Sequence, residues 1–225
     1  MALTRELVAR APPSSADPGP APGPPPMTDE DYELAVQQIV AGAPAGEIWL
    51  FAYGSLLWKP ECEIADGRRA VIHGWHRAYC VRVLRFRGTV DRPGLMMSLD
   101  RGGQCHGMIM RLAGDVQASL HKLLRRELVI KPSPQCFRWC TAHTAGGPVR
   151  VITFAVNHRS ERYVGKLDLD DIADAVATAA GHWGSCAEYL HETVARLEEL
   201  GIHDRKLWRL QQLVAERLGR SRVSA

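Results

Sequence analysis

The order of its hydrophobic patterns constrains this chain most, because patterns typical of strands come first and patterns typical of helices come last. Residues 48–53 form a short apolar run that ends at Gly54, and residues 79–83 and 149–152 alternate or carry β-branched side chains. Weaker strand patterns cover residues 95–99, 105–112 and 137–142. Since the strands precede the helices instead of alternating with them, the sequence predicts an α+β fold.

Helical spacing dominates the last third of the chain. Predicted helices cover residues 168–180 and 187–200, and Gly181 and Gly201 stand where these helices should end. A third helical pattern begins near Asp204. The expected fold therefore closes with three helices.

The N-terminal region differs in composition from the rest. Residues 11–26 read APPSSADPGPAPGPPP, which has too little apolar surface to offset the entropy lost on ordering. Thr28 is a candidate N-cap of a following helix, and Met27 is a second candidate for the start of the protein. We expect a Pro/Ala-rich disordered tail plus a short helix over residues 1–46 and one folded domain over residues 47–220.

Charge and hydropathy argue against several classes of protein. The formal net charge is only +3 and the arginines are dispersed, which gives no support to nucleic-acid binding. No stretch approaches the roughly 18 consecutive apolar residues of a membrane helix, and the N-terminus lacks the apolar core of a secretory signal. The dispersed cysteines are typical of reduced thiols; they are Cys62, Cys80, Cys105, Cys136, Cys140 and Cys186. We expect a cytoplasmic protein that binds neither membranes nor nucleic acids, and the sequence does not specify its oligomeric state.

One loose cluster, Cys136, Cys140 and His143, has a partial resemblance to a metal site. Its C-x3-C-x2-H spacing does not meet the C-x2-4-C and H-x3-5-H spacing of structural zinc sites. Buried thiols on a strand are the favoured interpretation, so we expect no metal.

One carboxylate lies where a helix should bury apolar side chains. The apolar side chains of residues 116–128 fall on one arc of roughly 140° when each residue turns the helix by about 100°; they are Val116, Leu120, Leu123, Leu124 and Leu128. Glu127 lies inside this arc, whereas the positive charges of Lys122, Arg125 and Arg126 lie on other faces and point outward. Partial burial would raise the pKa of Glu127 and make it a competent general base. A buried salt bridge or a hydrogen-bonded core glutamate is the alternative that periodicity leaves open.

A second candidate feature is Tyr53-Gly54-Ser55-Leu56, at the end of the first strand pattern. The glycine allows a sharp turn and lets a ligand approach backbone N–H groups, which can hold a carboxylate or a developing oxyanion. An ordinary strand-ending turn is the alternative. Common nucleotide, zinc-protease and serine-hydrolase motifs are absent from the sequence.

Several motifs together resemble those of the ChaC-type, glutathione-specific gamma-glutamylcyclotransferases, over about residues 48–218. The most specific is WLFAYGSLLWKP at residues 49–60. The others are GWHRAYC at 74–80, RGT at 87–89, RPGL at 92–95, REL at 126–128, EYL at 188–190 and LGIHD at 200–204.

This resemblance implies a small mixed β-barrel flanked by helices, with Glu127 in the place of the catalytic glutamate. It also implies that one continuous segment grips the gamma-glutamyl group of the substrate; its residues are Leu50, Phe51, Ala52, Tyr53, Gly54 and Ser55. Tyr163 is a further candidate near the substrate. The chain departs from the family pattern at Ala52, at Leu128 and over residues 129–135, where the family is shorter and includes a tyrosine.

The implied reaction splits glutathione into 5-oxoproline and Cys-Gly, without metal or cofactor, by attack of the substrate's α-amino group on its own side-chain carbonyl. Glu127 would act as general acid and base, and Arg87 or Arg92 would pair with a substrate carboxylate. Two alternatives stay open: cyclotransfer on other gamma-glutamyl amino acids or amines, and a non-catalytic member of the fold that binds or senses a metabolite.

Overall fold

The computed structural model describes residues 1–20, 23–44 and 47–220. The chain divides into two compact units, neither of which is one continuous stretch. Unit 1 comprises Met1–Pro22, Tyr79–Met97 and Arg162–Ala225, and unit 2 comprises Gly23–Ala78 and Ser98–Glu161. The domain boundaries expected from the sequence, 1–46 and 47–220, stay a prediction.

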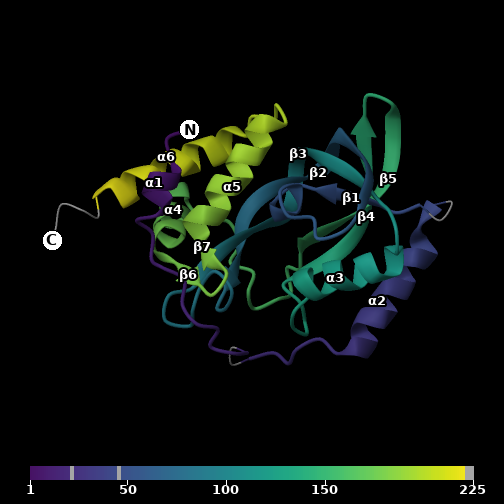
Figure 1. Cartoon of the computed structure of the whole chain (residues 1–225), viewed down its shortest axis with the longest axis horizontal. Helices are drawn as coiled ribbons and strands as arrows, with labels where there is room; N and C mark the ends of the chain where they lie inside the picture. The colour runs from purple at the N-terminus through teal and green to yellow at the C-terminus, as the bar shows by residue number, and fades with distance from the viewer. Residues whose placement is uncertain (21–22, 45–46, 221–225) are drawn as a thin grey trace. The chain divides into compact units, whose positions relative to one another are not determined.

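Five strands form a closed barrel in the order β1-β3-β2-β4-β5 (Figure 1). They are β1 (Trp49–Ala52), β2 (Ile64–Val83), β3 (Gly94–Leu112), β4 (Gln135–Thr144) and β5 (Gly147–Val156). Strand β1 is antiparallel to β3 and parallel to β5, so the barrel is mixed. The predicted α+β fold with a small mixed barrel is confirmed.

Strand β1 is buried along its whole length, which agrees with its continuous apolar sequence. Its Leu50 pairs with Met110 of β3 on one side and with Ile152 of β5 on the other. A side chain at Gly107 of β3 would place its Cβ 2.4 Å from the carbonyl oxygen of Ala52. Glycine is therefore required at this position of β3, beside the end of β1.

Unit 2 also contains two helices, α2 (Asp29–Gly42) and α3 (Val116–Glu127), which lie side by side (Figure 1). Thr28 caps α2 as predicted and forms a reciprocal capping box with Asp31. Asp115 caps α3 by accepting a hydrogen bond from the N–H of Ala118 at 2.9 Å. Tyr32 of α2 donates to the carbonyl oxygen of Leu128 at 2.8 Å, which fixes the chain at the end of α3.

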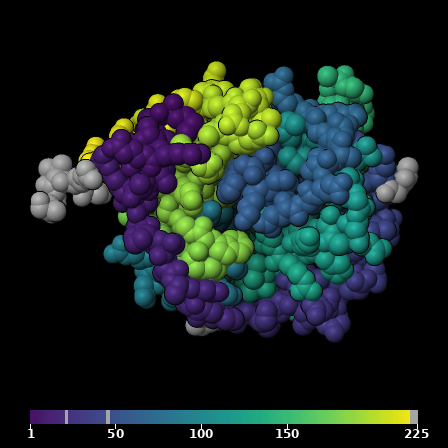
Figure 2. Space-filling model, viewed as in Figure 1, coloured from purple at the N-terminus to yellow at the C-terminus, as the bar shows by residue number. Residues whose placement is uncertain are grey.

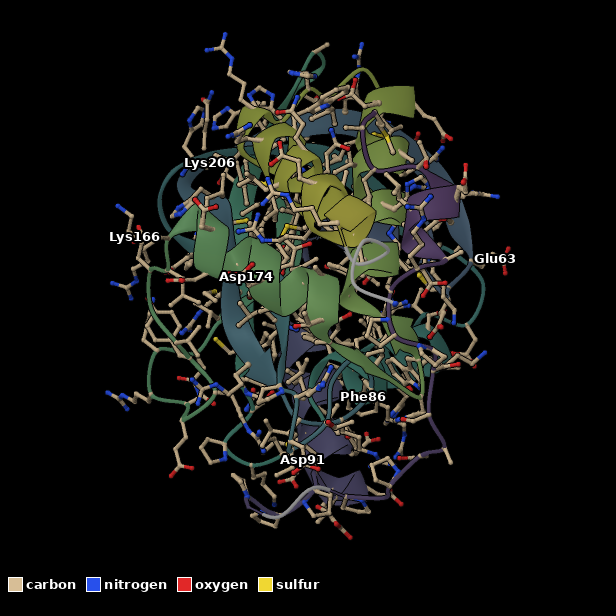
Figure 3. All side chains as sticks on the ribbon, turned by 90° about the vertical axis from the view of Figure 1, so that its left-hand side faces the viewer. Glu63, Phe86, Asp91, Lys166, Asp174 and Lys206 are labelled. Carbon is tan, nitrogen blue, oxygen red and sulfur yellow. The ribbon has the colours of Figure 1, made fainter. Side chains whose placement is uncertain are left out.

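Unit 1 contains the three C-terminal helices, α4 (Leu169–Thr178), α5 (Cys186–Glu199) and α6 (Arg205–Arg220). The predicted first helix is slightly too long, because residue 180 belongs to a short hairpin of β6 (Ala180–Gly181) and β7 (Gly184–Ser185). Asp174, labelled in Figure 3, lies on α4 and pairs with Arg217 of α6. No helix among the described residues has the length and hydropathy needed to cross a membrane.

The first ten residues of the chain are ordered, although we expected a flexible tail there. They form a short helix, α1 (Arg5–Val8), and Leu3 has no exposed surface. The N–H of Leu3 donates to Oε1 of Gln211 at 2.6 Å, and its carbonyl oxygen lies 2.9 Å from Nδ1 of His191. Figure 2 shows this purple segment against the yellow-green C-terminal helices of the same unit. Residues 11–20 contain no helix or strand, and the disorder expected of them from their composition stays a prediction.

Candidate active site

Helix α3 ends at Glu127 and buries the apolar stripe on which this residue lies. Leu120, Leu123 and Leu124 of the stripe have at most 1% exposed surface. The Glu127 side chain is 12% exposed. Burial raises its pKa, while the positive charge of Arg126 and a hydrogen bond from Gln135 oppose part of this rise. The expected inward carboxylate is therefore present at the end of α3.

Arg126 does not point outward as the periodicity indicated. Its side chain is only 13% exposed, and Nη2 donates to Oγ of Ser55 while Nη1 donates to the carbonyl oxygen of Lys59, each at 2.7 Å. Its Nε lies 3.5 Å from Oε1 of Glu127. The long side chain reaches back because these acceptors lie beside the last turn of α3. Arg126 thereby links the turn after β1 to the carboxylate.

The turn after β1 is held by buried polar side chains. Arg77 is 8% exposed and donates from Nε to the carbonyl oxygen of Tyr53 at 2.7 Å. The hydroxyl of Tyr53 donates to the carbonyl oxygen of Phe154 at 2.9 Å. Both ends of this tyrosine are therefore fixed to the barrel wall, which positions Gly54 and Ser55.

A single 3-10 turn, η2 (Ser55–Leu57), follows Gly54. Its hydrogen bonds run from the N–H groups of Leu57 and Trp58 to the carbonyl oxygens of Gly54 and Ser55. The N–H groups of Gly54, Ser55 and Leu56 have no acceptor within the described part of the chain. First-turn amides lack intrahelical acceptors and can bind oxygen atoms that carry negative charge.

Gln135, the first residue of β4, completes the surroundings of the carboxylate. Its Nε2 donates to Oε2 of Glu127 at 3.1 Å. Its Oε1 accepts a hydrogen bond from Oγ of Ser98 at 3.2 Å, and the hydroxyl of Tyr53 lies 3.5 Å from the same oxygen. Sequence reasoning did not single out Gln135 or Ser98, although residues 129–135 stood out as a departure from the family pattern.

Residues 48–217 match the family model described as ChaC-like protein. The chain belongs to the ChaC-like family. The resemblance that its sequence motifs indicate is confirmed, and the matched residues include the turn after β1, Glu127 and Gln135.

Curated relatives and a solved structure agree with this membership. The glutathione-specific gamma-glutamylcyclotransferase of Escherichia coli (strain K12) is 34% identical over 71% of this ChaC-like chain and 69% of the relative. The glutathione-specific gamma-glutamylcyclotransferase 1 of Mus musculus is 26% identical over 80% of this chain and 76% of the relative. The crystal structure of a gamma-glutamyl cyclotransferase specific to glutathione from yeast is similar in fold, with a TM-score of 0.67 at 20% identity over 76% of this chain and 96% of that one.

The structure brings some of the expected site residues of this ChaC-like chain together. Tyr53 and Ser55 are linked to Glu127 through Gln135 and Arg126. The preceding residues Leu50, Phe51 and Ala52 lie in β1, where each pairs with β3. Their roles in binding the gamma-glutamyl group stay a prediction.

Tyr163 belongs to unit 1, where it forms an isolated bridge with Val81. Its role near the substrate stays a prediction. Arg87 of the same unit is 12% exposed and already pairs with Glu188 at 2.7 Å. Because this guanidinium also donates to the carbonyl oxygen of Ser185 at 2.7 Å, it has fewer donors left for a substrate carboxylate than Arg92, which is exposed.

The cysteine cluster does not form a metal site in the described residues, where no three histidine, cysteine, aspartate or glutamate side chains gather suitably. Cys136 and Cys140 share one face of β4, whereas His143 lies on the other face because side chains alternate along a strand. Burial raises the pKa of Cys136 and raises that of Cys140 to about 11. Burial likewise raises the pKa of Cys62, and that of Cys186 to about 11.

Proposed function

We propose that this ChaC-like chain is a gamma-glutamylcyclotransferase that cleaves glutathione into 5-oxoproline and Cys-Gly. The observation that carries the proposal is a nearly buried carboxylate, Glu127, joined through Arg126 to a turn with unpaired N–H groups. The names of the bacterial, mammalian and yeast relatives, each specific to glutathione, support glutathione as the substrate.

The chemistry balances without any further reactant. The α-amino nitrogen of the gamma-glutamyl group forms a bond to its own side-chain carbonyl carbon, and the amide bond to the cysteine nitrogen breaks. Both reacting groups belong to one molecule, so the protein needs chiefly to hold them in an attack geometry. No electron transfer occurs, and the reaction requires neither a redox cofactor nor a metal.

Glu127 is proposed to carry out the proton transfers of the reaction. An α-amino group with a pKa near ~8 is mostly protonated at neutral pH, so the nucleophile must first lose a proton. The Glu127 carboxylate accepts that proton and returns it to the departing amine of Cys-Gly. Its raised pKa brings its proton affinity closer to that of the amines with which it exchanges the proton.

The turn after β1 is proposed to bind the developing oxyanion. When the amine attacks, negative charge develops on the carbonyl oxygen, and N–H groups already oriented toward that position stabilise it. The unpaired N–H groups of Gly54, Ser55 and Leu56 support this role. We further propose that the reaction takes place in the cytoplasm, because all six cysteines are free thiols, as a reducing compartment favours.

The test is product analysis with the purified full chain and glutathione in water enriched in oxygen-18. Cyclotransfer should give equal amounts of 5-oxoproline and Cys-Gly, with no heavy oxygen in the 5-oxoproline. Hydrolysis would instead give glutamate that carries the label, and that product would overturn the proposal. A parallel panel of gamma-glutamyl amino acids and amines separates glutathione specificity from a broader cyclotransferase, and binding without any product would indicate a metabolite sensor.

A further inference from the structure

Three side chains of unit 2 form a hydrogen-bonded series that ends on Glu127. Ser98 of β3 contacts Gln135 of β4, and Gln135 contacts the carboxylate at the end of α3. Ser98 has no exposed surface and Glu127 is 12% exposed. Gln135 itself is half-buried, and an amide between a hydroxyl and a carboxylate is held in one orientation only if each of its two ends has a suitable partner.

The direction of these hydrogen bonds fixes the amide of Gln135. An ionised carboxylate only accepts hydrogen bonds, so the amide nitrogen must face Glu127 and the amide oxygen must face away. Tyr53 has one hydroxyl hydrogen, and the carbonyl oxygen of Phe154 at 2.9 Å is a nearer acceptor for it than Oε1 of Gln135 at 3.5 Å. Ser98 is therefore the donor that satisfies the amide oxygen and opposes a flip of the amide.

The backbone around Gln135 is held on both sides, so the amide starts from a fixed position. Gln135 pairs with Val156 at the start of the β4–β5 ladder. The N–H of Asn157 donates to the carbonyl oxygen of Pro134 at 2.8 Å, and its side chain donates to the carbonyl oxygen of Ser133 at 3.0 Å. Segment 129–135, which departs from the family pattern, thus delivers a side chain to the carboxylate.

We propose that Gln135 is a positioning residue for the cyclotransfer reaction, holding Oε2 of Glu127 so that Oε1 exchanges the proton with the substrate. This inference rests on the proposed function. The charged groups around the carboxylate are Arg126, whose Nε lies 3.5 Å from Oε1, and Glu61, which lies 3.4 Å from Nη1 of Arg126. Neither of these groups is the donor to Oε2 of Glu127, which instead accepts its hydrogen bond from Nε2 of Gln135.

The test replaces Gln135 by leucine, which is similar in size but donates nothing. A hydrogen bond to a charged group contributes about 1.5–3 kcal/mol, so kcat at neutral pH should fall by about tenfold or more while KM changes little. Loss of the donor favours the protonated carboxyl, so the acid limb of the pH profile of kcat/KM should move to higher pH. Gln104→Leu, at an exposed position of β3, is the matched control and should leave rate and profile unchanged.

Two further variants keep the inference falsifiable if Gln135→Leu folds poorly. Ser98→Ala removes the hydroxyl that orients the amide and should shift the acid limb in the same direction by a smaller amount. In a Glu127→Gln background, Gln135→Leu should lower the residual rate no further, because the two residues act through one carboxylate. A folded Gln135→Leu variant with an unchanged profile would overturn the positioning role, even if it melts at a lower temperature.

The failure of this inference can be told apart from the failure of the proposed function. If the wild-type chain forms no 5-oxoproline, the function fails, and carbon-13 NMR titration of the Glu127 carboxyl in wild type and Gln135→Leu still measures the interaction. A higher titration midpoint in the variant supports the contact, and equal midpoints reject it. If the wild type is active and the profiles coincide, the function stands and the positioning role falls.

Discussion

Glu127 carries its charge at the end of α3, where only 12% of its side chain is exposed. Burial raises its pKa, and Arg126 and Gln135 oppose only part of that rise. A carboxyl with a higher pKa in the folded than in the unfolded state binds more protons when folded, so stability falls as the pH rises from the ordinary pKa through the raised one. In its ionised form Glu127 therefore lowers the free energy of unfolding.

Replacing Glu127 by glutamine should separate reactivity from stability. The change keeps the shape of the side chain but removes the basic oxygen, so turnover should fall by about 10²–10⁴-fold, the usual contribution of general acid–base catalysis. The melting temperature at neutral pH should not fall, because burial of the ionised carboxylate costs more than the charge of Arg126 and the hydrogen bond from Gln135 contribute. Glu63→Gln, at an exposed position of unit 2, should alter neither quantity. Near-normal turnover by folded Glu127→Gln would reject Glu127 as the base.

The pH dependence of the wild type follows from the same residue. Only the ionised carboxylate accepts the ammonium proton, so kcat/KM should fall as the pH decreases through the raised pKa of Glu127. Activity is then lost at a less acidic pH than an ordinary exposed glutamate would allow. Measuring kcat/KM from acidic to neutral pH, over a range of glutathione concentrations at each pH, checks this prediction. A value that stays constant down to the ordinary pKa of a glutamate would contradict it.

Sequence periodicity was sufficient to find Glu127, because a carboxylate on an apolar helix stripe is visible without any knowledge of tertiary contacts. It failed for Arg126, since helical spacing gives the direction of the Cβ but not the path of a long side chain. Gln135 and Ser98 meet only through the pairing of strands that are distant in sequence. No local pattern marks them, and only the fold brings them to the carboxylate.

At the scale of single elements, the turn after β1 depends on a strand that is buried on both faces. The apolar run of β1 and the α3 stripe were both predictable from local patterns. The barrel closure was not, because the parallel pairing of β1 with β5 joins segments that are about a hundred residues apart. Arg77 holds the resulting strand end through the carbonyl oxygen of Tyr53.

A side chain at Gly54 should disturb this turn. Gly54 is buried and precedes η2 directly, so valine there would crowd the unpaired N–H groups and hinder close approach of the substrate. We expect a markedly higher KM and a lower kcat for Gly54→Val. Gly67→Val is the control, because Gly67 lies at an exposed position of the strand β2, and β-branched side chains are common in strands. The steady-state kinetics of this variant should match those of the wild type. Normal kinetics for Gly54→Val would remove the turn from the site.

At the scale of the whole molecule, unit 1 is built from segments taken from the beginning, middle and end of the chain. Leu3 is the clearest sign of this, because its N–H donates to Oε1 of Gln211 and its carbonyl oxygen faces Nδ1 of His191. Both of these residues are at most 8% exposed. Arg85 of the middle segment pairs with Asp17 at 2.5 Å. Composition alone could not reveal these contacts, since a few apolar residues ahead of a Pro-rich stretch carry no periodic signal.

Shortening the chain to begin at Met27 should therefore destabilise it, whereas a flexible tail would predict no loss. The truncation leaves Gln211 and His191 without their backbone partners. In the full chain, Leu3→Ala should lower the free energy of unfolding by about 2–5 kcal/mol, as for other buried leucines. Leu34→Ala on α2, where the leucine is 56% exposed, should change it by less than about 0.5 kcal/mol in the same urea titration. Equal values for the two variants would show that the Leu3 side chain contributes nothing to stability, and unchanged stability of the truncated chain would show the same of residues 1–26.

The raised pKa values of the thiols have a consequence for an enzyme whose proposed substrate is itself a thiol that cells also hold as a disulfide. Exchange between a protein cysteine and a disulfide proceeds through the thiolate, and burial keeps Cys140 and Cys186 protonated at neutral pH with pKa values of about 11. These cysteines should form mixed disulfides with oxidised glutathione only slowly. Oxidation of Cys140 and Cys186 would then not limit activity under oxidising conditions, so the rate would follow the concentration of reduced glutathione instead of the redox state of these two thiols.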